Sequence, residues 1–140
     1  MSDLKAKILE KMNDYTLASF ATITGDGKPW NRYVVVKADE QMNIWFATFN
    51  GSRKTQHIAA NDEVHLVLGV EDMQKAVSWV QVQGRAEIYD DAETKKTTWY
   101  DMLQTIFTGP DDPNYVVCKV KPYRIEYYTM NRPDHEVWEA

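Results

Sequence analysis

The sequence predicts a mainly β (α+β) fold in which about six antiparallel strands close into a barrel, with short helices at its periphery. Candidate strands outnumber candidate helices, and most of them are joined by tight polar turns. Strands and helices do not alternate regularly, which argues against a parallel sheet. A chain of 140 residues, 44% of them hydrophobic, can bury one core, so residues 1–140 are expected to form a single domain.

The N-terminal part is expected to hold one helix and three strands. Ser2 can cap a helix whose apolar residues recur at helical spacing, namely Leu4, Ile8, Leu9 and Met12. Residues 15–24 and 30–37 read as a hairpin around a Gly- and Pro-containing turn. A third strand, 43–49, places Ile44, Phe46 and Thr48 on one face and Trp45, Ala47 and Phe49 on the other.

The remaining helices and strands are predicted from capping residues, turn residues and changes in the apolar pattern. A short helix capped by Ser52 is expected at 53–61, then a strand at 63–70 and a long strand at 76–89, where Gly84 indicates a bulge or a close backbone approach. A helix starting at Asp90-Asp91 would place a stripe on one face: Trp99, Met102, Leu103, Ile106 and Phe107. Residues 115–130 form either a strand pair or one strand interrupted at Pro122.

Composition excludes several classes of function. The net charge of −5 disfavours nucleic acid and anionic lipid as partners. No apolar run approaches the roughly 20 residues that span a bilayer. The single Cys118 and the absence of a signal-like N-terminus favour the reducing cytoplasm. The three histidines show no metal-ligand spacing, and no catalytic side chain is nominated.

The strongest chemical clue is the segment Thr48–Lys54, which leads from the third strand into the short helix. Arg53 and Lys54 fall in the first turn, where the helix dipole is already positive, so each cation costs up to about 1 kcal/mol there. A phosphate would compensate them, with hydrogen bonds from Ser52 and the first amides and close approach at Gly51. The alternative is that both side chains extend into water.

A second basic segment is Arg32–Lys37, with the sequence Arg-Tyr-Val-Val-Val-Lys. Positions five apart in a regular strand point to opposite faces, so Arg32 and Lys37 cannot both hold one phosphate unless a bulge intervenes. At most one of the two is a phosphate ligand.

These two segments, continuing through Gln56, Ile58 and Asn61, resemble the pyridoxamine 5'-phosphate oxidase-like superfamily, and the short chain resembles its general stress protein branch. The resemblance implies a six-stranded split β-barrel that forms a homodimer with flavin mononucleotide (FMN) between the subunits. By position it assigns the phosphate to Arg32, Arg53 and Lys54, assisted by Ser52 and Thr48. It assigns the flavin ring to the backbone of Tyr33, Val34 and Val35, with Lys37 and Ala47 also at cofactor-contacting positions.

The resemblance is incomplete in two places. The family's glutamine on the long strand has no clear counterpart among Trp79, Gln81 and Gln83, and the oxidases' C-terminal substrate-binding segment is not matched. Vitamin B6 oxidation is therefore not expected. An FMN-dependent oxidoreductase acting on a small molecule, with a nicotinamide donor, is the first hypothesis. The alternatives are a flavin-binding stress or carrier protein without turnover and a barrel that binds a deazaflavin or haem; the basic residues argue against haem.

Overall fold

The computed structural model describes residues 3–70 and 72–140, so the expected cap Ser2 lies outside the described residues. Helix α1 (Asp3–Met12) buries Ile8 and Met12, as its apolar repeat predicts. Six strands form the barrel: β1 (Thr16–Ile23), β2 (Pro29–Ala38), β3 (Ile44–Phe49), β4 (Glu63–Leu68), β5 (Ser78–Tyr89) and β6 (Tyr115–Thr129).

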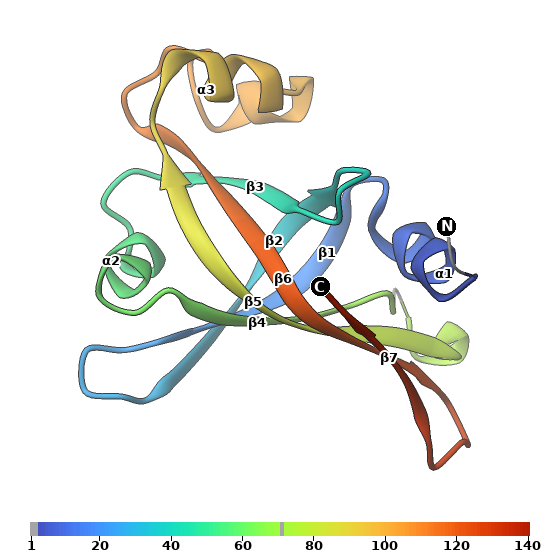
Figure 1. Ribbon diagram of the computed structural model, residues 1–140. Helices are drawn as coiled ribbons and strands as arrows, with labels where there is room; N and C mark the ends of the chain where they lie inside the picture. Colours follow the sequence, from blue (N-terminus) through green and yellow to red (C-terminus); the bar gives the residue numbers. More distant parts are fainter. Residues whose placement is uncertain (1–2, 71) are drawn as a thin grey trace.

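The strands pair in the order β3-β2-β1-β4-β5-β6, and antiparallel pairing of β3 with β6 closes the barrel (Figure 1). The predicted six-stranded antiparallel barrel is thereby confirmed. The unassigned tail adds a further strand, β7 (His135–Glu139), which pairs with β6 outside the closed barrel. None of the helices in the described part of the chain has the length and apolarity needed to span a lipid bilayer.

The core fills the barrel interior with the inward side chains of alternating strand positions. Each large apolar side chain buried in this way contributes about 1.5–3 kcal/mol. The alternation predicted for β3 is confirmed, since Ile44, Phe46 and Thr48 are buried. The other buried members include Phe20, Val36, Leu66, Val82, Val120 and Ile125.

The irregularity expected at Gly84 is present. The β5–β6 register shifts between Gln83 and Gly84, and Gly84 lies opposite Pro122. A Cβ built on Gly84 would come within 2.7 Å of Val120 Cγ1, so the glycine allows close backbone approach. Because the bulge accommodates Pro122, β6 continues through it as one strand.

The predicted amphipathic helix after Asp91 is only partly formed. Asp91 caps α3 (Ala92–Thr98) by accepting from the Thr94 amide, but the chain is extended at Trp99 and continues as the 3₁₀ helix η2 (Asp101–Thr105). Threonine hydroxyls in the last turn of α3 bond back to its carbonyls, which weakens a helix.

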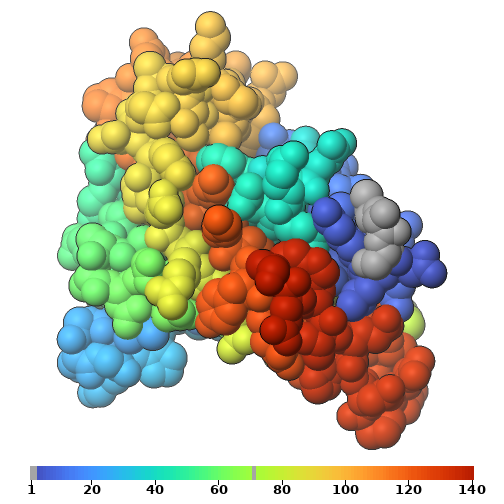
Figure 2. All heavy atoms as spheres, viewed as in Figure 1, coloured from blue at the N-terminus to red at the C-terminus, as the bar shows by residue number. Residues whose placement is uncertain are grey.

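The long apolar stripe predicted there was wrong. Leu103 and Phe107 are buried against Tyr115, whereas the Met102 and Ile106 residues are 60% and 53% exposed. The break at Trp99 changes the helical phase, so the five residues do not share one face. Figure 2 shows the yellow and orange segment with α3 and η2 forming one end of the molecule.

Two short elements complete the fold. Helix α2 (Arg53–Ala60) follows β3 directly, as predicted, and buries Ile58. The 3₁₀ helix η1 (Met73–Lys75) precedes β5. In Figure 1, α2 lies at the end of β3 where the chain leaves the barrel wall. Arg53 and Lys54 of α2 lie near Trp30 and Arg32 of β2.

Candidate functional site

Strands β2 and β3 separate soon after they pair. Their ladder holds only two pairs, Lys37 with Trp45 and Ala38 with Ile44. From residue 36 back to residue 29, β2 pairs with β1 on its other edge, while β3 pairs with β6 along its whole length. The β2 edge that faces β3 at residues 32–36 therefore has no strand beside it, and its backbone groups are placed to bond a ligand.

The gap between the diverging β2 and β3 is called the split below. Arg32 lies at one end of it, with its guanidinium held against β1. Arg32 Nη1 donates to Thr22 Oγ1 at 2.8 Å, and to the Phe20 and Trp30 carbonyl oxygens at 3.3 and 3.2 Å. Its Nη2 is buried and has no partner in the described part of the chain. A buried guanidinium nitrogen requires an acceptor, and an anion bound here would supply one.

The start of α2 faces the same end of the split. Gly51 has a φ of +77°, a left-handed conformation that glycine adopts without strain, and Ser52 occupies the N-cap position. The expected capping bond of Ser52 was wrong, because its side chain makes no cap hydrogen bond. Its hydroxyl lies 3.4 Å from that of the buried Thr48 instead. The two hydroxyls and the first amides of α2 thus form a polar surface beside the arginines.

Arg32, Arg53 and Lys54, called the cationic cluster below, carry three positive charges close together. Burial lowers the pKa of Lys54, and the charge of Arg32 lowers it further. Burial also lowers the pKa of Arg32, with a second contribution from Arg53. The ion pairs formed among residues 3–70 and 72–140 include none of the three. Multidentate anions such as phosphate relieve this kind of repulsion.

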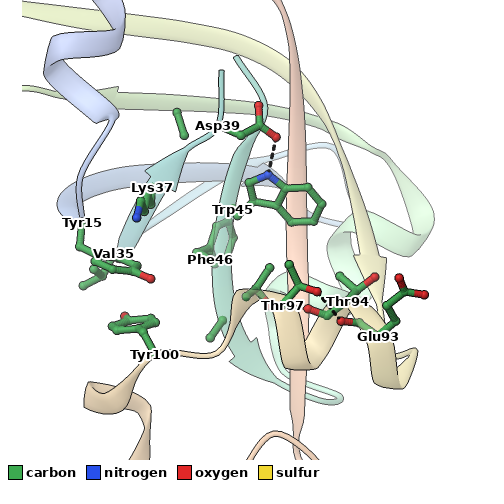
Figure 3. Close-up of a pocket in the computed structure, with 13 residues that line it drawn as sticks. Tyr15, Val35, Lys37, Asp39, Trp45, Phe46, Glu93, Thr94, Thr97 and Tyr100 are labelled. Atoms are coloured by element: carbon green, nitrogen blue, oxygen red, sulfur yellow. Dashed lines mark hydrogen bonds between the residues drawn. The ribbon is translucent and has the colours of Figure 1, made fainter. Parts of the chain in front are cut away.

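A pocket of about 480 Å³ opens between the outer face of the diverging β2–β3 pair and α3 (Figure 3). It is lined on one side by residues of β2 and β3 that lie next to the split and on the other by threonines of α3. Its lining comprises Tyr15, Val35, Lys37, Ala38, Asp39, Trp45, Phe46, Ala47, Glu93, Thr94, Thr97, Thr98 and Tyr100.

Aromatic rings and one cation dominate the wall that Figure 3 shows on the β1 side of this pocket. The Tyr15 and Tyr100 rings stack with centroids 4.0 Å apart, and Lys37 Nζ lies 4.9 Å from the Tyr15 ring centre. Burial is the largest cause of the raised pKa of each phenol, Tyr15 and Tyr100, so both stay neutral at pH 7. On the facing side Trp45 Nε1 donates to Asp39 Oδ2 at 2.9 Å.

The site residues predicted from sequence fall into two groups. Arg32, Thr48, Ser52, Arg53 and Lys54 gather at the cationic end of the split, while Val35, Lys37 and Ala47 line the pocket. The prediction that Arg32 and Lys37 point to opposite faces of β2 is confirmed.

The other two predicted positions, Tyr33 and Val34, lie on the part of β2 without a β3 partner. The Tyr33 side chain is 75% exposed and Val34 faces the core, and the backbone groups of both lie on the edge of β2 that has no β3 partner.

Sequence reasoning missed several residues of the site. Tyr15 and Tyr100 are 85 positions apart, and nothing in the sequence indicated that they stack. Arg53 lies with its guanidinium 5.2 Å from the centre of the Trp30 ring, a cation–π contact that hairpin geometry creates. His57 Nδ1 lies 2.8 Å from Thr22 Oγ1, and the spacing of His57 after Lys54 on one helix is the only sequence signal for it.

The long strand adds no residue to the lining of the pocket, and the described histidines form no metal site. Trp79 Nε1 donates to Gln81 Oε1 at 3.2 Å, and the Trp79 ring stacks on Tyr128, while neither Gln81 nor Gln83 lines the pocket of Figure 3. In the described part of the chain, no group of His, Cys, Asp and Glu residues could hold a metal ion.

The chain is similar to known proteins in both sequence and structure. The family described as pyridoxamine 5'-phosphate oxidase like matches residues 3–138. General stress protein 26 of Bacillus subtilis is 33% identical over 120 residues, 86% of this chain and 84% of that protein. The crystal structure of general stress protein 26 from Bacillus anthracis superposes with a TM-score of 0.84 at 27% identity, covering 99% of this chain and 100% of the other.

The similarity to two further proteins is more limited. A pyridoxine/pyridoxamine 5'-phosphate oxidase of Shewanella sediminis is 34% identical over 92 residues, 66% of this chain, and the match spans only 42% of the oxidase. An FMN-binding, pyridoxamine 5'-phosphate oxidase-related protein of Nostoc punctiforme shares the fold, with a TM-score of 0.68 at 16% identity over 87% of this chain and 78% of that one.

Proposed function

Because this chain belongs to the pyridoxamine 5'-phosphate oxidase-like family, we propose that it binds FMN and acts as an FMN-dependent oxidoreductase on a small molecule. The observation that carries the proposal is the cationic cluster, which forms no ion pair within residues 3–70 and 72–140 and leaves Arg32 Nη2 buried without an acceptor there. The terminal phosphate of FMN satisfies both requirements. The Nostoc protein of the same fold is described as FMN-binding.

In this proposal the two parts of the cofactor lie at the two ends of the split. Arg32, Arg53 and Lys54 hold the phosphate, assisted by the Ser52 and Thr48 hydroxyls. The unpaired β2 edge at Tyr33–Val35 offers backbone N–H and C=O groups to the polar edge of the flavin ring. The pocket of Figure 3 then adjoins the ring and receives the substrate.

Bound FMN supplies hydride or electron transfer, and the protein supplies orientation and electrostatics. Lys37 places a positive charge at the pocket, where it stabilises negative charge that develops on a reduced acceptor. The apolar wall of Val35, Ala47 and the Tyr15–Tyr100 stack limits the access of water to the ring face. No side chain of this chain needs to act as nucleophile or general base.

The proposal includes a homodimer, supported by an exposed apolar patch across β2, β1 and β4. Leu17 lies opposite Val35, and Ser19 lies opposite both Tyr33 and Val67, so the exposed side chains of Leu17, Tyr33, Val35 and Val67 form one continuous surface. Surfaces of this kind mark interfaces. A second copy covering this patch also encloses the neighbouring split.

The test is to purify the protein and record its absorbance, then to denature it and identify any molecule released. A yellow preparation that releases FMN supports the proposal, while release of a deazaflavin or haem, or failure of the apoprotein to take up added FMN, overturns it. Anaerobic mixing with NADH and NADPH follows. Bleaching of the flavin supports an oxidoreductase, and absence of bleaching by either donor supports a flavin carrier without turnover.

A further inference from the structure

His57 is joined to the cationic cluster by a short chain of hydrogen bonds across three elements. Arg32 Nη1 on β2 donates to Thr22 Oγ1 on β1 at 2.8 Å. Thr22 Oγ1 in turn lies 2.8 Å from Nδ1 of His57 on α2. The Thr22 residue is 1% exposed, so water does not substitute for either partner.

The donors and acceptors fix the direction of this chain. A guanidinium can only donate, so Thr22 Oγ1 accepts from Arg32. The Thr22 hydroxyl still carries its own hydrogen, and a buried hydroxyl hydrogen needs an acceptor. Since His57 Nδ1 is its other hydrogen-bond neighbour, Thr22 donates to it. His57 is therefore neutral in this arrangement, with Nδ1 as the acceptor and the ring proton on Nε2.

The hydrogen bond from Thr22 to His57 helps to fix the position of the Arg32 guanidinium. Three oxygens accept from the one nitrogen Nη1, and the strongest of these contacts by distance is the one that His57 orients. The other terminal nitrogen, Nη2, is left buried without a partner. The Arg32 guanidinium is thus fixed through one nitrogen, while the second is a buried donor that lacks an acceptor among the described residues.

We propose that His57 is a positioning residue for phosphate recognition: through Thr22 it holds Arg32 with Nη2 presented to the phosphate of the cofactor. The inference rests on the proposed function and deepens it, because it makes His57 a determinant of selectivity for the phosphorylated flavin. His57 itself does not contact the phosphate in this scheme.

The test compares FMN with riboflavin, which has the same ring but no phosphate. His57→Leu removes the acceptor, Thr22→Val removes the hydroxyl at similar volume, and His57→Gln restores an acceptor without an imidazole. Affinities are measured by quenching of flavin fluorescence in each apoprotein. His135→Leu, on β7, serves as the matched histidine control.

The expected result is a loss of FMN affinity of about tenfold in His57→Leu and in Thr22→Val, as for a hydrogen bond that orients a charged group. Riboflavin affinity stays within about twofold of wild type. His57→Gln recovers most of the loss, and the double variant His57→Leu/Thr22→Val loses no more than either single one, because both interrupt the same chain.

Equal losses for FMN and riboflavin overturn the inference, since they indicate a general effect on the fold. Unchanged FMN affinity in both single variants overturns it as well. If His57→Leu does not fold, Thr22→Val tests the same hydrogen bonds from the other end. Failure of the wild-type apoprotein to bind FMN is a separate outcome, which overturns the proposed function itself.

Discussion

Arg32 and Lys54 come from different elements, β2 and α2, yet the charge of Arg32 contributes to the lowered pKa of Lys54. Two cations brought together without an anion destabilise the apoprotein. Such an arrangement is expected where a protein is built to bind a negatively charged ligand.

Lys54→Met is expected to raise the stability of the apoprotein while it weakens stabilisation by FMN. The substitution removes one charge of the cationic cluster at a helix N-terminus, an effect of about 0.5–1 kcal/mol. Thermal unfolding with and without FMN measures both effects. Lys75→Met, at an exposed lysine in η1, is the control and should leave the FMN-induced shift intact. A fall in the melting temperature of the Lys54→Met apoprotein would contradict the prediction.

FMN affinity is expected to weaken as pH rises through the lowered pKa of Lys54. Lys54 has a pKa below its ordinary 10.5, so it loses its charge at a lower pH than an ordinary lysine, while the phosphate stays dianionic. The stability of the apoprotein changes with pH in the opposite direction. Between the lowered and the ordinary pKa of Lys54 the unfolded chain binds more protons than the folded one, so apoprotein stability rises with pH. Fluorescence titrations at several pH values measure the affinity. In Lys54→Arg, which keeps its charge, the affinity should vary less with pH.

Arg53→Glu is expected to lower FMN affinity at least tenfold, about 1.4 kcal/mol, because a paired charge becomes a repulsive one. The substitution also ends the contact of Arg53 with the Trp30 ring, so the near-ultraviolet circular dichroism of Trp30 reports whether the site has rearranged. Lys121→Glu, on an exposed position of β6, makes the same charge change away from the site. Equal affinities of the two variants would count against phosphate binding by the cationic cluster.

Leu17→Glu is expected to shift the protein from dimer to monomer and to weaken FMN binding. Leu17 is 56% exposed and faces Val35 on the apolar patch, and a buried, unpaired carboxylate at an interface is unfavourable. Sedimentation velocity measures the oligomeric state. Met73→Glu, where Met73 is 91% exposed on η1, is the matched control. A wild-type protein that sediments as a monomer would refute the proposed homodimer directly.

Gly84→Ala is expected to destabilise the barrel by about 1–3 kcal/mol, the usual effect of overpacking. The new Cβ would meet Val120 Cγ1 at 2.7 Å and the Lys121 carbonyl oxygen at 3.0 Å, and the backbone oxygen cannot move aside easily. Gly25→Ala is the control, since a Cβ there meets nothing within 4 Å. Urea denaturation of both variants checks the difference, and equal midpoints would contradict the packing argument.

Local patterns in the sequence predicted most of the barrel. Strand positions, the buried face of β3, the irregularity at Gly84 and the helix after Ser52 were all visible as alternation, turn residues and caps. The stripe after Asp91 failed because periodicity assumes an unbroken helix, whereas the chain becomes extended at Trp99. Whether residues 115–130 formed one strand or two also depended on tertiary structure, because the bulge at Gly84 accommodates Pro122.

The sequence by itself determined the type of fold and the Arg53–Lys54 pair, because both depend on charges and apolar positions close together along the chain, while Arg32 was assigned through the resemblance to a known family. Only the tertiary structure decided that β2 and β3 part after two pairs, that Tyr15 stacks on Tyr100, and that His57 reaches Arg32 through Thr22. These contacts join residues on separate elements, and closure of the barrel brings those elements together. The spacing of residues along the sequence does not specify the distances between residues on separate elements.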